Sequence, residues 1–192
     1  MNKLFAQLSL VICLCLSYNL NAQTTPKVLD DALRNKLIAA INDSRSFTDK
    51  YAAEVWLTDM SLRMQRYVKH KDDRIKILTI LHEEAARVNV PPELVLAIIQ
   101  IESAFNRYAL SYVGARGLMQ VMPFWLKEIG KPNEDLFDIR TNLRMGCTIL
   151  RHYLDREKND KRKALARYNG SVGKRKYPDK IFKALSQNWY RQ

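Results

Sequence analysis

Three observations on the sequence predict an all-α protein. Apolar residues recur at three- and four-residue spacing in one segment after another, which is the period of a helix with one buried face. No segment of any length shows the alternation of apolar and polar residues that a half-buried strand requires. Glycine and proline are scarce, at six each in 192 residues, which argues against a fibrous or disordered chain. A chain of this length can bury a sizeable core.

The first 22 residues have the pattern of a secretory signal peptide. Lys3 gives a positive start, residues 8–16 form a short apolar run, and Leu20-Asn21-Ala22 is an imperfect cleavage site. The run is too short for a stable membrane span. Neither Cys13 nor Cys15 follows the small residues of a lipoprotein cleavage box. We therefore expect neither a lipid anchor nor an integral membrane segment in the mature chain.

Residues 23–73 are predicted to form an N-terminal helical segment. Thr25-Pro26 can cap and start its first helix, whose apolar residues follow at helical spacing: Leu29, Leu33, Leu37 and Ile41. A second helix is predicted to begin at the capping-box-like residues 46–49. Its apolar stripe comprises Tyr51, Val55, Trp56, Met60, Met64 and Tyr67. The charged residues 69–74 then form a break, which is a candidate subdomain boundary.

Two further helices are predicted on either side of Pro91 and Pro92. The first carries a helical pattern that ends near Asn89: Ile77, Leu78, Leu81, Ala85 and Val88. The second has proline at its first position and Glu93 in its first turn, and it continues through an apolar run over 94–101 that only Gln100 interrupts. A buried strand of similar length is the alternative for this apolar run, but the proline and the acid favour a helix.

Glu102 ends this apolar helix, where a carboxylate is unusual. At helical spacing it shares a face with four apolar residues: Val95, Ile98, Ile99 and Phe105. Apolar walls and the negative end of the helix dipole both disfavour the ionised carboxylate, so we expect its pKa to be raised. A carboxylic acid that is protonated near neutral pH is suited to general acid catalysis. Without further evidence, a solvated residue at a helix end is the simpler interpretation.

A glycine-containing loop follows. Gly114 and Gly117 permit positive φ and a close backbone approach, so the loop can fold back over the end of the helix. Pro123 is then predicted to start a short helix, which Gly130 ends.

The last third of the chain predicts three more helices. The 4-3-4 spacing of Leu143, Cys147, Leu150 and Leu154 predicts a helix over 139–157, in which Gly146 would permit close packing and Cys147 would be buried. Residues 164–168 form a short helix that ends at Asn169-Gly170. Pro178 starts a final amphipathic helix with an apolar face: Ile181, Phe182, Leu185 and Trp189.

The sequence lacks the motifs of several kinds of catalytic and binding site. The three histidines are scattered, and His82-Glu83-Glu84 lacks the second histidine of a zinc-binding helix. Only Cys147 remains once the signal peptide is removed. No phosphate-binding loop, serine elbow or dinucleotide fingerprint occurs. Nucleic-acid binding would rest on charge alone. We therefore expect no metal, no cofactor and no nucleic-acid partner.

The chain is strongly basic, with a formal net charge of +12. The excess of Lys and Arg is concentrated in residues 151–192, where Lys161-Arg162-Lys163 and Lys174-Arg175-Lys176 flank the Tyr168-Asn169 pair. A basic surface favours a polyanionic partner. For an exported chain, an acidic cell-wall polymer is the natural candidate.

Three sequence blocks, in this order, resemble the soluble lytic transglycosylase family, which comprises lysozyme-like muralytic enzymes of bacteria. The first is Glu102-Ser103, the second is Ala109-Leu110-Ser111 together with residues 114–123, and the third is residues 164–170. The resemblance implies a lysozyme-like (goose-type) helical catalytic domain over residues 74–192. The additional N-terminal helical segment carries no motif of the family.

The resemblance also implies an activity and a set of site residues. In this family one Glu protonates the glycosidic oxygen between N-acetylmuramic acid and N-acetylglucosamine in peptidoglycan. The same Glu then takes a proton from the muramyl 6-hydroxyl, which closes a 1,6-anhydro ring without metal or cofactor. By position, Glu102 is this acid and base. The residues that would bind substrate are Ser111, Gln120, Met122, Tyr168 and Asn169. The hydroxyl of Tyr168 would orient the carboxyl of Glu102.

Some alternatives stay open from the sequence. Residues 170–173 depart from the family's usual continuation after Asn169. A second carboxylate, as two-acid glycosidases use, would have to come from Glu128, Glu134, Asp135 or Asp138. A goose-type lysozyme would hydrolyse the same bond with water, and a non-catalytic wall-binding secretion-accessory protein would keep only the fold.

The expected setting follows from the signal peptide and the resemblance together. We expect export across the inner membrane and a periplasmic, monomeric protein whose partner is the peptidoglycan glycan strand. Its role is either wall turnover or opening of the wall for a secretion or conjugation complex.

Overall fold

The computed structural model describes residues 35, 38, 46–47, 49–129 and 131–190. Their helices are α2 (Lys50–Met64), α3 (Lys71–Arg87), α4 (Pro92–Ser103), α5 (Trp125–Ile129), α6 (Ile139–Arg156), α7 (Lys161–Tyr168) and α8 (Lys176–Ala184), and α8 continues into the π-helical turn η1 (Leu185–Trp189). Among these residues the structure forms no strand beyond isolated bridges in the loop before α5. The all-α prediction is confirmed for the described part of the chain.

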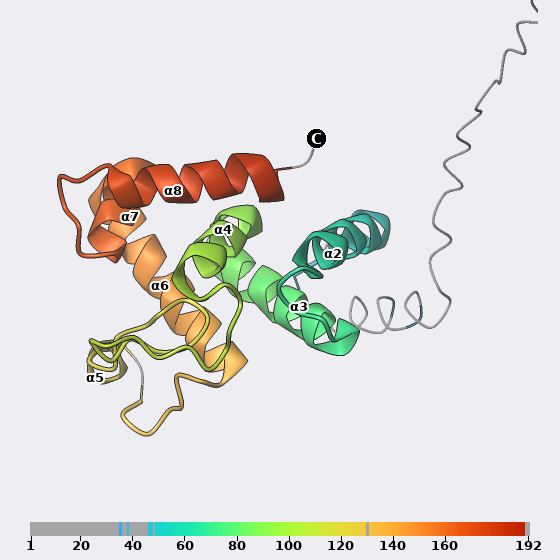
Figure 1. The fold of residues 1–192 in the computed structure, drawn as a ribbon, viewed down its shortest axis with the longest axis horizontal. Coiled ribbons are helices and arrows are strands. Elements are labelled where there is room, and N and C mark those ends of the chain that lie inside the picture. Colours follow the sequence, from blue (N-terminus) through green and yellow to red (C-terminus); the bar gives the residue numbers. More distant parts are fainter. Residues whose placement is uncertain (1–34, 36–37, 39–45, 48, 130, 191–192) are drawn as a thin grey trace, which may run out of the picture. The chain divides into compact units, whose positions relative to one another are not determined.

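Helix α4 lies at the centre of the packing (Figure 1). Six consecutive side chains of α4 are buried, from Leu94 to Ile99, because α3, α8 and η1 all pack against this helix. Helix α3 in turn packs on α2 and α6, and α7 bridges α6 and α8. An apolar run without a polar face is therefore explained by neighbours on several sides, and the predicted buried helix is confirmed.

Helix α2 differs from its prediction in two respects. It begins after Asp49, whose side chain accepts hydrogen bonds from the backbone N–H groups of Tyr51 and Ala52, and not at a capping box that starts at Ser46. Tyr51 is 84% exposed and Val55 58%, whereas Trp56, Met60 and Met64 are buried. Tyr51 and Val55 lie one turn apart on the exposed face of α2, so the predicted stripe mixed two faces of one helix.

The charged residues 69–74 form the turn into α3 and its first residues. Arg74 is buried, and its guanidinium donates to the hydroxyl of Ser61 and to the carbonyls of Val68 and Lys69. The described residues belong to one compact unit, with no division at this turn. The predicted signal peptide lies outside the described residues, as does the predicted helix before residue 42 except for Asn35 and Ile38, which are helical.

The predicted helix over 139–157 is confirmed as α6, and its two special residues lie as expected. A Cβ atom at Gly146 would lie 2.3 Å from the sulfur of Met119, so only glycine admits this contact between α6 and the loop before α5. Cys147 is fully buried, and desolvation raises the pKa of its thiol to about 12. A thiol that stays protonated is a packing residue and no nucleophile.

Candidate active site

The end of α4 presents Glu102 at the rim of the core. The helix stops at Ala104, which adopts the left-handed conformation with φ of 48°. Ser103 lies 2.8 Å from the carbonyl oxygen of Leu118 and donates its hydroxyl there, which joins the end of the helix to the glycine loop. The loop therefore folds back over the end of α4, as the glycine pattern predicts.

Asn142 of α6 holds this loop in place. Its side-chain oxygen accepts from the N–H of Met119 at 2.8 Å, and its amide donates to the carbonyls of Arg116 and Leu136. Gly117 has φ of 73°, and a Cβ there would lie 2.3 Å from the Asn142 amide nitrogen and 2.4 Å from the Leu136 oxygen. Glycine at this position is therefore required both by the backbone conformation and by the close approach of α6.

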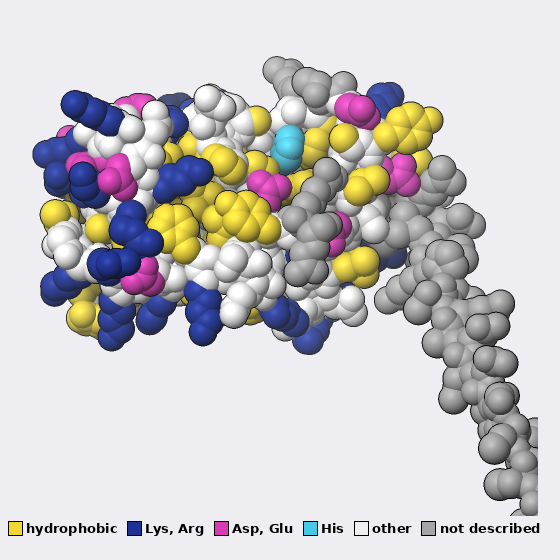
Figure 2. All heavy atoms as spheres, turned by 90° about the horizontal axis from the view of Figure 1, so that it is seen from above, with side chains coloured by type: hydrophobic (Ala, Val, Ile, Leu, Met, Phe, Trp, Pro, Cys, Tyr) yellow, Lys and Arg dark blue, Asp and Glu magenta, His cyan; other side chains and the backbone are white. Residues whose placement is uncertain are grey.

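A cavity of about 320 Å³ opens beside Glu102. Its lining comes from the end of α4, the loop after α7 and the start of α8: Ile101, Glu102, Asn169, Ser171, Lys174, Lys176, Tyr177 and Lys180. Glu102 is the only acid among these lining residues. Three lysines accompany it, and Lys and Arg side chains crowd the end of the molecule where α7 meets α8 (Figure 2).

Tyr177 provides the direct partner of the carboxyl group. Its hydroxyl lies 2.6 Å from Oε1 of Glu102 and donates to it. Burial raises the pKa of Glu102 above its ordinary range, and the hydrogen bond from Tyr177 opposes that rise because it favours the charged form. Burial also raises the pKa of Tyr177, as does the nearby charge of Glu102, so this phenol stays a proton donor in the hydrogen bond.

The structure gives Tyr168 a different partner from the one that the family resemblance implies. Its hydroxyl donates to the carbonyl of Met119 at 2.8 Å, so it supports the glycine loop and does not contact the carboxyl. The charge of Glu102 nevertheless contributes to the raised pKa of Tyr168, after burial as the main cause, which places the two groups near one another. The orienting hydroxyl is thus that of Tyr177, in the first turn of α8.

The other predicted site residues fall into two groups. Asn169 lines the cavity with Glu102. Ser111 and Gln120 hold the loop together, since the hydroxyl of Ser111 accepts from the N–H of Ala115 and the amide of Gln120 donates to the carbonyls of Ala109 and Gly117. Met122 is partly buried just before Pro123 and is not among the residues that line the cavity.

None of the four alternative carboxylates lines the cavity with Glu102. Asp138 caps α6 through the N–H of Thr141, and Asp135 and Glu134 bond to the backbone of their own loop. Among the described residues, no group of three or more potential metal ligands occurs, and no helix is both long and apolar enough to span a membrane.

In this all-α domain the cavity presents one carboxyl with a raised pKa, an arrangement that suits the class of single-carboxyl acid–base enzymes. Comparison with known families agrees with this class. Residues 79–189 match the model of the Transglycosylase SLT domain. The chain belongs to this family.

The chain is similar to several proteins of known name. The transglycosylase of Enterobacteria phage PRD1 is 36% identical over 109 residues, which cover 53% of this chain and 40% of the phage protein. Membrane-bound lytic murein transglycosylase C of Histophilus somni (strain 2336) is 32% identical over 160 residues, 66% of this chain and 41% of the relative. The 70 kDa soluble lytic transglycosylase of Escherichia coli aligns over 74% of this chain and 25% of its own, with 22% identity and a TM-score of 0.41. The matches thus span less than half the length of these proteins.

Proposed function

We propose that this protein is a peptidoglycan lytic transglycosylase that cleaves the β-1,4 bond between N-acetylmuramic acid and N-acetylglucosamine. Family membership supports the substrate and the reaction class. The observation that carries the proposal is the partly buried carboxyl of Glu102, which has a raised pKa, a single phenol partner and no second acid in the lining of its cavity.

The first step uses Glu102 as an acid. Its proton passes to the glycosidic oxygen, the bond from that oxygen to the muramyl anomeric carbon breaks, and the N-acetylglucosamine side leaves as an alcohol. The substrate's own acetamido group stabilises the positive charge that develops. A raised pKa favours this step because the carboxyl must hold its proton until the substrate binds.

The second step uses the same group as a base. The carboxylate of Glu102 takes the proton of the muramyl 6-hydroxyl, and the 6-oxygen bonds to the anomeric carbon to close the 1,6-anhydro ring. The carboxyl is thereby protonated again, and no water is consumed. Tyr177 supports both steps because its donated hydrogen bond holds one carboxyl oxygen and leaves the other for the substrate.

Mass spectrometry of the products tests the proposal. Digestion of purified sacculi by the mature protein should release muropeptides that end in an anhydro sugar, one water lighter than the products of hydrolysis. Products with a reducing muramic acid end would instead assign the chain to a lysozyme-like hydrolase. No release by a folded protein would leave a wall-binding accessory role.

We also propose that the protein works in the periplasm, on the strength of the signal-peptide pattern in residues 1–22. Fractionation of cells that express the full chain should place the shortened protein in the periplasmic fraction. Full-length protein that remains in the cytoplasm would contradict export.

A further inference from the structure

A second cavity adjoins the one at Glu102. Its volume is about 380 Å³, and α4, α8 and η1 supply its lining: Gln100, Ile101, Lys180, Lys183, Ala184, Gln187 and Asn188. Ile101 and Lys180 line both cavities. The two hollows are therefore parts of one groove, which runs from the carboxyl of Glu102 along α8 toward η1.

A row of lysines follows this groove. Lys176, Lys180 and Lys183 are spaced by four and three residues, so they share one face of α8, and all three are exposed. At a rise of about 1.5 Å per residue, the row is about 10 Å long. The acid on this helix, Asp179, forms ion pairs with Arg162 and Arg175. Among the described residues, no Asp or Glu lines the second cavity.

Gln100 lines the second cavity, and its side-chain amide has a fixed orientation. Its side-chain oxygen accepts from the indole N–H of Trp189 at 2.8 Å and from the amide of Asn188 at 3.2 Å. Because an indole N–H can only donate, the atom facing it must be the oxygen of Gln100, and this fixes the amide orientation. The NH₂ group of Gln100 therefore points away from Trp189, in a residue that lines the cavity.

We propose that this second cavity binds a carboxylate of the peptide attached to the muramyl sugar, and that Lys183 and Gln100 select for peptide-bearing strands. The inference rests on the proposed function, since it extends the same groove. Ammonium and amide N–H groups are donors that suit a carboxylate. Ile101 and Ala184 offer an apolar surface between them for a methyl side chain. An extended peptide advances about 3.3 Å per residue, so about three residues match the row of lysines.

Lys183 is the residue to change because it lines the second cavity and not the first. The Lys183→Glu variant and the parent would be assayed on soluble, uncross-linked strands with their peptides, on the same strands with the peptide carboxyls amidated, and on peptide-free glycan strands. We expect kcat/KM for peptide-bearing strands to fall about three- to tenfold, the scale of an exposed charge reversed beside an anion. We expect kcat/KM for peptide-free strands to stay unchanged. The ratio of kcat/KM for peptide-bearing strands to kcat/KM for peptide-free strands should therefore fall by the same factor.

Two further variants sharpen the test. Gln100→Glu keeps the acceptor for Trp189 and removes the donor, so it should lower the same ratio. Lys76→Glu is the control, because it reverses an exposed lysine charge on α3 that lines neither cavity. It should leave the ratio unchanged. The effect of Lys183→Glu should shrink in high salt, which screens exposed charges.

The outcomes separate the inference from the proposed function. If the parent cleaves amidated and peptide-free strands as well as native ones, or if Lys183→Glu lowers all three rates equally, the cavity does not bind a peptide carboxylate. If the parent releases no anhydro product from any strand, the proposed function fails first. An unchanged thermal midpoint of the variant establishes that it is folded when these rates are compared.

Discussion

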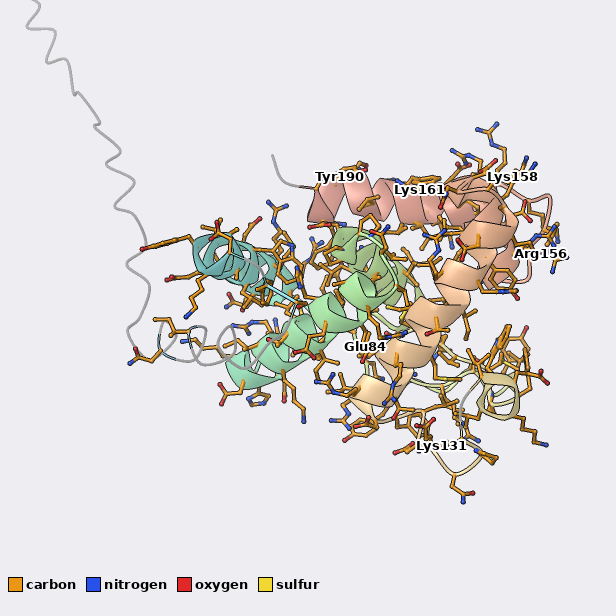
Figure 3. The ribbon with its side chains drawn as sticks, turned by 180° about the vertical axis from the view of Figure 1, so that it is seen from behind. Glu84, Lys131, Arg156, Lys158, Lys161 and Tyr190 are labelled. Atoms are coloured by element: carbon orange, nitrogen blue, oxygen red, sulfur yellow. The ribbon has the colours of Figure 1, made fainter. Side chains whose placement is uncertain are left out.

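Two glutamates lie against the core of this protein, and their surroundings differ. Glu84 of α3 is 6% exposed, and its carboxyl pairs with Arg87 at 2.7 Å and with Arg140 of α6 at 3.5 Å. Glu102 at the end of α4 accepts a hydrogen bond from the phenol of Tyr177. Among the described residues, none of the ion pairs includes Glu102. Figure 3 shows Glu84 between α3 and α6, where it joins two helices.

The difference shows how surroundings assign a role to the same side chain. A buried carboxylate that pairs with arginines on two helices ties those helices together. A partly buried carboxylate without a cation holds its proton more tightly, and burial raises the pKa of Glu102 accordingly. One environment therefore favours a structural ion pair, and the other suits the proposed general acid.

The largest effect is expected from removal of the acid. Glu102→Gln keeps the shape and the acceptor for Tyr177 but cannot donate the proton. Because one group serves both proposed steps, we expect wall-lytic activity to fall about 10²- to 10⁴-fold. Turbidity of a sacculus suspension measures the rate, and a folded Glu102→Gln protein with substantial activity would refute the assignment.

The matched change at the other glutamate should affect stability instead. Glu84→Gln leaves Arg87 without its ion-pair partner, and we expect a loss of about 1–2 kcal/mol in the free energy of unfolding. The loss is modest because Arg87 is half exposed and water can solvate its charge. Activity per folded molecule should stay near that of the parent. Denaturant unfolding measures the first quantity, and a loss of activity without a loss of stability would show that the contrast between the two residues is wrong.

Glu102→Gln should also change stability, but in the opposite direction. The folded state raises the pKa of Glu102, so it binds more protons than the unfolded state between the two pKa values. The parent therefore loses stability as pH rises from the ordinary Glu pKa through the folded pKa, and glutamine removes this loss. Above that window the variant should have the higher melting temperature, whereas a lower one across the whole range would argue against a raised pKa.

A smaller effect on activity than that of Glu102→Gln is expected at Tyr177. Tyr177→Phe removes the hydrogen bond to Glu102, so the rate should fall about five- to thirtyfold, as loss of 1–2 kcal/mol predicts. Because that bond lowers the pKa of Glu102, its loss should raise the pKa further and move the alkaline limb of the pH–rate profile upward.

Tyr168→Phe is the matched control for this change. It leaves the carbonyl of Met119 unpaired and should cost about 1–3 kcal/mol of stability, with the position of the alkaline limb unchanged. If Tyr168→Phe moved the limb and Tyr177→Phe did not, the two hydroxyls would have exchanged roles.

The parts of this site that follow from local sequence were predictable. The proline start, the apolar run and Glu102 at its end are features of one helix, and Gly146 and Cys147 follow from the period of another. The partner of Glu102 was not predictable, because Tyr177 lies 75 residues away and only the packing of α8 on α4 brings it close.

The role of Asn142 in holding the loop was harder to predict from the sequence. Its position one turn before Gly146 on α6 marks the face that meets the loop, but nothing local shows that its amide binds three backbone groups. The groove and its row of lysines likewise depend on how α8 lies beside α4. Tertiary contacts between distant segments therefore decide which groups complete a site that a single helix begins.

The dependence of kcat/KM on pH tests the central claim most directly, namely that Glu102 acts from its protonated form in a partly buried position. For the parent enzyme on peptide-free glycan strands, activity should be retained above the ordinary Glu range and then fall as one proton is lost at the raised pKa of Glu102. A profile that is flat to alkaline pH, or one that falls already at the ordinary Glu pKa, would contradict it.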